Sequence, residues 1–241
     1  KLVRFSRWCQ YRSVMQPAVY NWIAATPTAI FNSNNIPPVL GQRSFVLNGD
    51  LLNPLAPNSP ISLGKIARVI SITSAGNVSV VNFTITGTYN GLPVSQTITG
   101  PNATTVYTTQ FFNTVDSVTF NANVTSATNV GTGNAGVATA GAWGVTNWFA
   151  YDFFTPFSML TTQAKVNTAT VNYSLEVTLD DILITPEASL TLFNPIAGMT
   201  NATTNQIGNI NFPICYARLK FNNATTSAGS LTATFLQQGL Q

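Results

Sequence analysis

Residues 171–179 read VNYSLEVTL, and this stretch decides the fold class. Apolar and polar residues alternate along it with a period of two, which is typical of a half-buried β-strand whose polar face is turned outward. Residues 217–221 and 231–235 show the same alternation. Residues 78–86 also alternate, but the phase changes between Val80 and Val81, which predicts a β-bulge made by one inserted residue.

The turn signals agree with a series of short strands. Asn90-Gly91 separates two β-forming runs, and Asn-Gly is the favoured pair of a type I′ hairpin because both residues take positive φ. Residues 75–77 and 228–229 separate further runs, and no capped helical pattern follows Ile66. We therefore expect an all-β protein, an antiparallel β-sandwich of the jelly-roll or immunoglobulin-like type.

The first 60 residues differ from the rest of the chain. They contain seven prolines, which remove backbone donors and interrupt both helices and central strands. Large apolar residues lie between the prolines, unlike in a disordered tail. We expect a long irregular N-terminal arm over residues 1–60, docked on its own domain or on a neighbour. A sandwich domain over 61–241 would follow, with long insertions around 126–160 and 185–211.

Aromatic residues gather in the arm and again over residues 143–157. The second group is either the core of another sheet or a surface that faces a partner, because aromatic side chains are enriched at both. The candidate interface residues are Trp8, Tyr11, Tyr20, Trp22, Phe31, Trp143, Trp148 and Tyr151.

Charged residues are unusually scarce. Only 7% of the chain is Asp, Glu, Lys or Arg, against about a quarter in soluble domains. A surface with so little charge is suited to being covered by partners, because a monomer depends on charge to keep neighbours apart. Biased use of Asn codons is the alternative explanation, but it does not account for the lack of Lys and Glu. We expect a homo-oligomer.

The positive charge is concentrated at the N-terminus. Lys1, Arg4, Arg7 and Arg12 give the first twelve residues a charge of +4, and the remainder sums to −1 from six basic and seven acidic residues. The net charge of +3 therefore describes an arm and not a nucleic-acid-binding domain. Four charges are few for neutralising nucleic acid, and the aromatic residues beside them favour docking on protein.

The sequence predicts neither a membrane partner nor a disulfide framework. No run reaches the roughly 18 apolar residues that a membrane span requires, and no signal-peptide pattern follows the first basic residues. Cys9 and Cys215 lie 206 positions apart, and two such residues are expected to be buried free thiols.

The chain contains no histidine. This excludes Ser-His-Asp and Cys-His nucleophile systems and every zinc site that uses histidine. Seven acidic residues remain for a glycosidase that uses two carboxylates, yet few basic residues are present to surround such a pair. We expect no enzyme, no catalytic residue and no cofactor.

Three motifs resemble functional sites but have simpler interpretations. Residues 131–136 match G-x-G-x-x-G without the helix that a dinucleotide site requires, so we expect a loop. Seven Asn-x-Ser/Thr sequons are mostly chance in a chain this rich in Asn and Thr. Asp180, Asp181 and Glu187 form the only acidic cluster. Calcium prefers such oxygen ligands, but a solvated strand end is the favoured interpretation, and no metal site is expected.

Two segments resemble a known group of proteins. Residues 87–106 (GTYNGLPVSQTITGPNATTV), continuing through 112–118 (FNTVDSV), resemble a sheet-forming segment of small virion proteins of tailed bacteriophages. Residues 217–221 (ARLKF) and 229–237 (GSLTATFLQ) are similar to the closing hairpin of the same group. Together these segments cover roughly a quarter of the chain. The resemblance implies a structural role in a virion and assigns no functional residues.

Two functions from different classes follow as expectations. The first is a structural component of a bacteriophage virion, as a capsid decoration, minor capsid, head–tail or tail protein that contacts other virion proteins. The second is a carbohydrate- or receptor-binding β module on a virion or cell surface, in which the aromatic residues of 143–157 stack on sugar rings.

Overall fold

The computed structural model describes residues 18–22, 28–32, 44–45, 47, 61–63, 65–132, 144–151, 160–168, 171–223 and 229–237. Within these residues the regular structure is almost entirely β-strand, apart from two single-turn 3-10 helices, η1 (Glu187–Ser189) and η2 (Ala197–Met199). Every strand pairing in the described part is antiparallel. The predicted all-β class is confirmed. The part of the chain that the structure describes contains no helix with the length and hydropathy of a membrane span.

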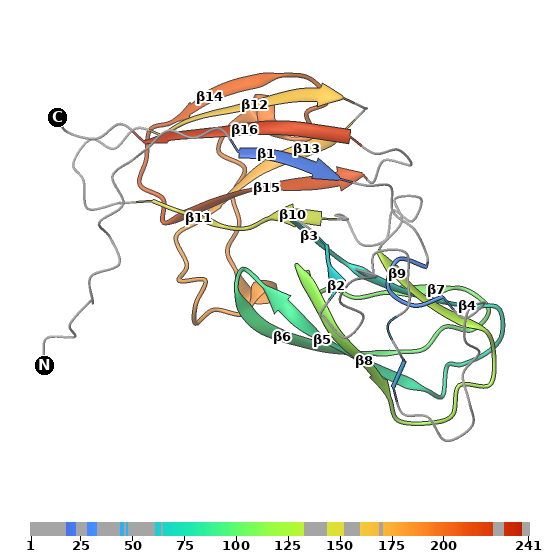
Figure 1. Cartoon of the computed structure of the whole chain (residues 1–241). Helices are drawn as coiled ribbons and strands as arrows, with labels where there is room; N and C mark the ends of the chain where they lie inside the picture. The colour runs from blue at the N-terminus through green and yellow to red at the C-terminus, as the bar shows by residue number, and fades with distance from the viewer. Residues whose placement is uncertain are drawn as a thin grey trace, which may run out of the picture.

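Four sheets lie in two groups, one above the other in Figure 1. The first sheet has the strand order β1 (Ala18–Trp22), β16 (Gly229–Gln237), β12 (Leu160–Thr168), β14 (Gln206–Ile210). The second has the order β11 (Phe149–Ala150), β15 (Tyr216–Asn223), β10 (Gly144–Thr146), β3 (Ile66–Arg68), with β13 (Asn172–Thr178) paired to β15. These two sheets form what we call the C-terminal sandwich.

The other two sheets form the N-terminal sandwich. One has the order β2 (Ile61–Ser62), β8 (Thr114–Phe120), β5 (Asn82–Tyr89), β6 (Leu92–Thr99). The other has the order β7 (Thr105–Tyr107), β4 (Ile70–Ser74), β9 (Thr128–Thr132). Only Val69 separates β3 from β4, so one nearly continuous strand passes from the first group of sheets into the second.

Each sandwich has its own apolar core, and a third cluster joins them. Tyr173, Leu175 and Val177 of β13 belong to the C-terminal core, and Phe83 and Ile85 of β5 belong to the N-terminal core. The alternation of the strands explains this arrangement, because every second side chain points between the facing sheets. The third cluster contains Ala67, Val69, Tyr89, Phe111, Val145 and Trp148.

The described parts of the expected arm pack on the chain itself. Residues 18–22 form β1 and pair with β16 at the edge of the first sheet. Phe31 and Phe45 are buried in the N-terminal core, where their rings stack with centroids 4.2 Å apart. The segments 126–160 and 185–211, expected as insertions, contribute β9, β10, β11 and β14. All four strands span five residues or fewer, which is too short for a clear alternating pattern in the sequence.

The Asn90-Gly91 hairpin is confirmed, whereas the bulge predicted within residues 78–86 is wrong. Asn90 and Gly91 have φ values of 51° and 77° between β5 and β6, as a type I′ turn requires. The phase change arises from a turn before β5, closed by the Val81 N–H donating to the Val78 carbonyl at 2.9 Å. The register shift lies later, between Thr86 and Gly87 opposite β8.

The predicted strand at 171–179 is present as β13, but its polar face is not turned to solvent. Ser174, Glu176 and Thr178 are all buried. β13 carries the C-terminal core on its other face, and the opposite face is covered by the third cluster and by residues that follow β13. This correction locates the candidate site.

Candidate functional site: a polar face on β13 and β15

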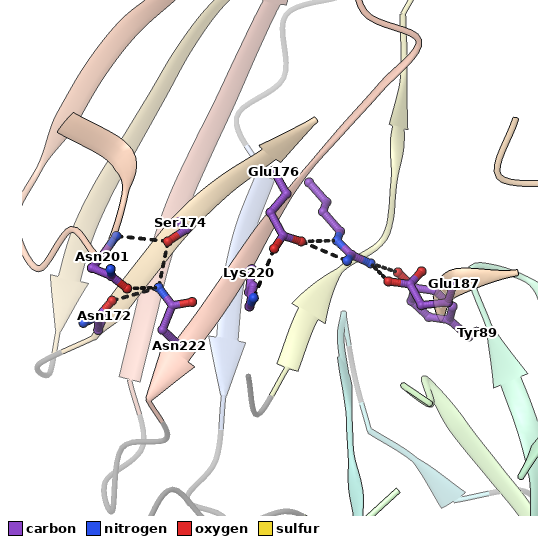
Figure 2. A network of polar contacts seen from close by, with 9 residues as sticks. Tyr89, Asn172, Ser174, Glu176, Glu187, Asn201, Lys220 and Asn222 are labelled. Carbon is purple, nitrogen blue, oxygen red and sulfur yellow. Dashed lines mark hydrogen bonds and ion pairs between the residues drawn. The ribbon is translucent and has the colours of Figure 1, made fainter. Parts of the chain in front are cut away.

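The candidate site is the covered polar face shared by β13 and β15. The two strands pair side by side, with Ser174 opposite Lys220 and Glu176 opposite Arg218. In each strand the odd-numbered residues fill the C-terminal core, so the even-numbered side chains all emerge on the other face. Figure 2 shows the polar contacts of this face in two groups, one around Glu176 and one around Asn222. The first is an ion network centred on Arg218, and the second lines a pocket.

Arg218 is the centre of the ion network and is only 2% exposed. Its Nε and Nη2 both donate to Oε2 of Glu176, each at 2.9 Å. Its Nη1 lies 2.6 Å from Oε1 of Glu187 and donates to the Tyr89 hydroxyl at 2.9 Å. Lys220 Nζ lies 3.2 Å from the remaining oxygen of Glu176. A guanidinium suits this position because it donates along several fixed directions at once.

The same guanidinium lies against two aromatic rings of the third cluster. Its central carbon is 4.2 Å from the Trp148 ring centroid and 5.7 Å from that of Phe111. Cation–π contacts of this kind stabilise a desolvated charge. Because Tyr89 and Phe111 belong to the N-terminal sandwich and Trp148 to the C-terminal one, Arg218 ties the two sandwiches together.

Arg218 is a permanent charge. Burial alone would lower its pKa, but the neighbouring Tyr89, Glu187 and Glu176 raise it above the ordinary value. For Tyr89, burial acts in the opposite direction and raises the pKa above its ordinary range, because the charged form of tyrosine is the deprotonated one. Neither of these two groups can therefore exchange a proton near neutral pH, and their contacts hold the structure together.

Beside the network lies a polar pocket of about 470 Å³. The described part of its lining contains no aromatic side chain and consists of Asn172, Ser174, Glu176, Asn194, Thr200, Asn201, Lys220 and Asn222. The lining comes from β13, β15 and the segment between β13 and β14 that folds back over them.

Asn222 connects the walls of this pocket. Its Nδ2 lies within hydrogen-bond distance of Asn172 Oδ1 (2.9 Å), Ser174 Oγ (2.8 Å) and Asn201 Oδ1 (3.0 Å). An amide has two hydrogens, so three acceptors share two donors. Asn201 takes the left-handed conformation with φ of 55°, and its backbone N–H donates to Ser174 Oγ at 3.0 Å.

The described lining of the pocket offers hydrogen bonds, and its Ser174 has no base beside it that could activate it as a nucleophile. Ser174 Oγ is contacted by the Asn222 amide and the Asn201 N–H, and amide nitrogens cannot accept its proton. Glu176 is bound by Arg218 and Lys220 on both oxygens. Amide and hydroxyl groups arranged in this way can bind a neutral ligand rich in hydroxyl groups.

The three members of the predicted acidic cluster, Asp180, Asp181 and Glu187, have different partners in the structure. Glu187 pairs with Arg218, whereas the Asp180 carboxylate accepts from the Thr191 N–H and the Asp181 carboxylate from the Leu183 N–H. Among the described residues, no three acidic or cysteine side chains lie close enough to hold a metal ion.

The structure places the predicted interface residues in different settings. Tyr20, Phe31 and Trp148 are buried within the chain, and Tyr151 is half-buried against the C-terminal core. Trp22 lies in β1. Trp8, Tyr11 and Trp143 lie outside the described residues, as do Cys9 and the four basic residues of the arm. Cys215 is a half-buried free thiol.

Sequence reasoning missed Arg218 and Asn222 as members of a site. The alternation of residues 217–221 predicts a half-buried strand, and in such a strand the polar positions, Arg218 and Lys220, face outward. A usable signal was present, because Glu176 and Arg218 occupy the polar positions of two alternating stretches in a chain with very few charges.

No protein-family model matches the sequence, and no curated protein matches it significantly. Among solved structures, the structure of infectious bursal disease virus, Gx strain, aligns over 95% of this chain and 74% of that chain. The identity is 13% and the TM-score is 0.22. A likeness at this level carries no argument about function, so the proposals below depend on residues and geometry.

Proposed function

We propose that this protein is a non-enzymatic structural subunit of a virion, of the tailed-bacteriophage kind that its sequence resembles, and that it acts through interfaces with other virion proteins and with its own copies. The observation that carries the proposal is where the few charges lie. Ten charged side chains fall in the described part, and only Lys65, Asp116, Lys165 and Asp181 are exposed.

The fold lowers the surface charge further than the composition requires. Arg68, Glu176 and Arg218 are buried, so the described surface is polar through Thr and Asn and nearly uncharged. A free monomer of this kind lacks the charge repulsion that keeps soluble proteins apart. Such a surface is favourable in a subunit that neighbours cover on several sides.

Residues 1–17 are the segment that we expect to reach a neighbour. They precede β1, the first described strand, so their removal takes away none of the described core residues. Deleting them should abolish incorporation into particles, while far-ultraviolet circular dichroism and the urea midpoint stay unchanged. The full-length variant in which Gln replaces Arg4, Arg7 and Arg12 is matched to this deletion, because it removes positive charge from the segment without shortening the chain. Normal incorporation of the deleted protein would contradict the proposal.

A second candidate is binding of a carbohydrate, and the polar pocket favours it. Its amide, hydroxyl, ammonium and carboxylate groups match the donors and acceptors of a sugar, and about 470 Å³ accommodates a small one. The lining residues that the structure describes include no aromatic ring on which a sugar could stack, and this places the carbohydrate candidate second.

A glycan array tests this candidate. Binding that disappears in Asn194→Ala, a pocket residue, and persists in Asn209→Ala on β14 outside the pocket would support it. Absence of binding by the intact chain at high protein concentration would remove it.

A further inference from the structure

One stretch of the described surface exposes an unusual number of large apolar side chains. It leaves the end of β13 and returns beside it, and we call it the 179–193 surface. Five of its apolar side chains are exposed: Leu179 (59%), Leu183 (65%), Ile184 (80%), Leu192 (37%) and Phe193 (50%). Large apolar side chains exposed this often within one short stretch favour a surface that binds another molecule.

The 179–193 surface is held in place by hydrogen bonds. Phe193 pairs with Val177, the two backbones exchanging bonds of 2.9 and 3.0 Å. The Asp181 carbonyl accepts from the Thr185 N–H at 2.9 Å, and the Asp180 carboxylate accepts from the Thr191 N–H. Ile182 packs beneath the stretch on the third cluster. The apolar side chains are thus displayed on an ordered backbone, which reduces the entropic cost of binding.

The same surface carries negative charge, and no basic residue lies near it in the sequence. Asp181 is exposed and Asp180 half-exposed, while Glu187 is engaged by Arg218. No Lys or Arg occurs between residues 166 and 217. A complementary partner would combine positive charge with large apolar groups.

The N-terminal segment of this chain has that composition. Residues 1–12 read KLVRFSRWCQYR and place four basic residues among Phe5, Trp8 and Tyr11. Six basic residues remain in the rest of the chain, and two of them, Arg68 and Arg218, are buried. The arm therefore holds much of the positive charge that can reach a partner.

We propose that the 179–193 surface of one copy binds residues 1–17 of a neighbouring copy. The inference rests on the proposed structural function, because only a subunit that assembles with its own copies has the arm of a neighbouring copy within reach. Aromatic side chains of the arm would cover Leu183, Ile184 and Phe193, and its basic side chains would face Asp180 and Asp181. Apolar contact supplies affinity, and the charges set orientation and make the association sensitive to salt.

Cross-linking in the full chain tests the contact. Cys9 is the natural thiol of the arm, so Ile184→Cys in a Cys215→Ser background leaves one thiol on each proposed partner. A short bis-maleimide should then give covalent dimers and larger species on a denaturing gel. Val80→Cys in the same background is the matched control, because Val80 is 82% exposed on the N-terminal sandwich and Ile184 is 80% exposed.

We expect the Ile184→Cys protein to give at least about fivefold more intermolecular product than the Val80→Cys protein. Adding Asp180→Asn and Asp181→Asn should reduce that product about three- to tenfold, a loss typical of removing two surface charge contacts. The Asn side chains keep an acceptor for the Thr191 and Leu183 N–H groups. Equal product from the two cysteine positions, or linkage within single chains only, would overturn the proposal.

The two proposals can fail separately. If deletion of residues 1–17 blocks incorporation into particles but Ile184→Cys gives no excess dimer, the arm docks elsewhere and only the 179–193 surface is wrong. If the deleted protein also enters particles normally, the structural function assigned to the arm fails as well.

Discussion

At the scale of single residues, Arg218 is the side chain on which the junction of the two sandwiches depends most. Arg218→Met would leave Glu176 and Glu187 without their shared cation in a buried setting, which typically costs about 3–5 kcal/mol. Lys220→Met is the matched control, because Lys220 contacts the same Glu176 but is 29% exposed, and such a pair contributes about 1 kcal/mol or less. Urea unfolding followed by tryptophan fluorescence measures both. Equal losses in the two variants would show that Arg218 has no special role.

The buried tyrosines set the response to alkaline pH. Burial raises the pKa of Tyr173 to about 12 and those of Tyr20, Tyr89 and Tyr151 higher still. In the unfolded chain these groups ionise near pH 10, so above that pH the folded state binds more protons than the unfolded state. The contribution of these tyrosines to stability should be constant below pH 10 and fall as the pH rises further, by about 1.4 kcal/mol per pH unit for each such tyrosine.

Arg68 opposes this trend, because burial lowers its pKa to about 10. Above that pH the unfolded state keeps a proton on this guanidinium that the folded state has lost, so Arg68 adds stability as the pH rises. One arginine offsets one tyrosine, so the net effect remains a loss. Urea midpoints at pH 8 and pH 11 measure it, and Tyr173→Phe should make the loss smaller. A midpoint that does not change between these pH values would contradict the burial of the tyrosine hydroxyls.

At the scale of elements, two glycines of one hairpin have different functions. A Cβ on Gly87 would lie 1.9 Å from the Thr114 carbonyl oxygen, so Gly87→Ala must separate β5 from β8 at the register shift and should cost about 3 kcal/mol. Gly91 has a φ of +77° and no atom within 4 Å of its added Cβ. Gly91→Asn should cost less than about 1 kcal/mol, because Asn tolerates that conformation. Thermal unfolding of both variants tests the order, and a larger loss for Gly91→Asn would refute it.

The elements were largely predictable from sequence where the pattern was local. Alternation predicted β13, β15 and β16, and Asn90-Gly91 predicted the turn between β5 and β6. The environment of each face was not predictable in this way. Ser174, Glu176 and Thr178 alternate as a solvent-facing row would, but they are buried because segments distant in sequence cover them. Hydrogen bonds and an ion network make that burial tolerable.

At the scale of the whole molecule, the contacts that build the site join distant parts of the sequence. The Arg218 guanidinium and the Tyr89 hydroxyl are 129 residues apart, and composition or periodicity carries no information about such a meeting. The absence of histidine and the scarcity of charge were informative at this scale, since both describe the chain as a whole. They favoured a protein that works through its surfaces, and the exposed apolar side chains of residues 179–193 agree with that view.

The assembled state provides the last prediction. Light scattering on a gel-filtration column at moderate salt should give a defined oligomer whose mass is a multiple of 25.8 kDa, because a nearly uncharged surface with an exposed apolar region favours association. Raising the salt should weaken the association if the basic arm and Asp180 and Asp181 hold copies together, since salt screens exposed charges beyond about 10 Å at 0.1 M. Deleting residues 1–17 should give a monomer under the same conditions. A stable monomer formed by the intact chain would instead favour the carbohydrate-binding alternative, in which the polar pocket acts alone.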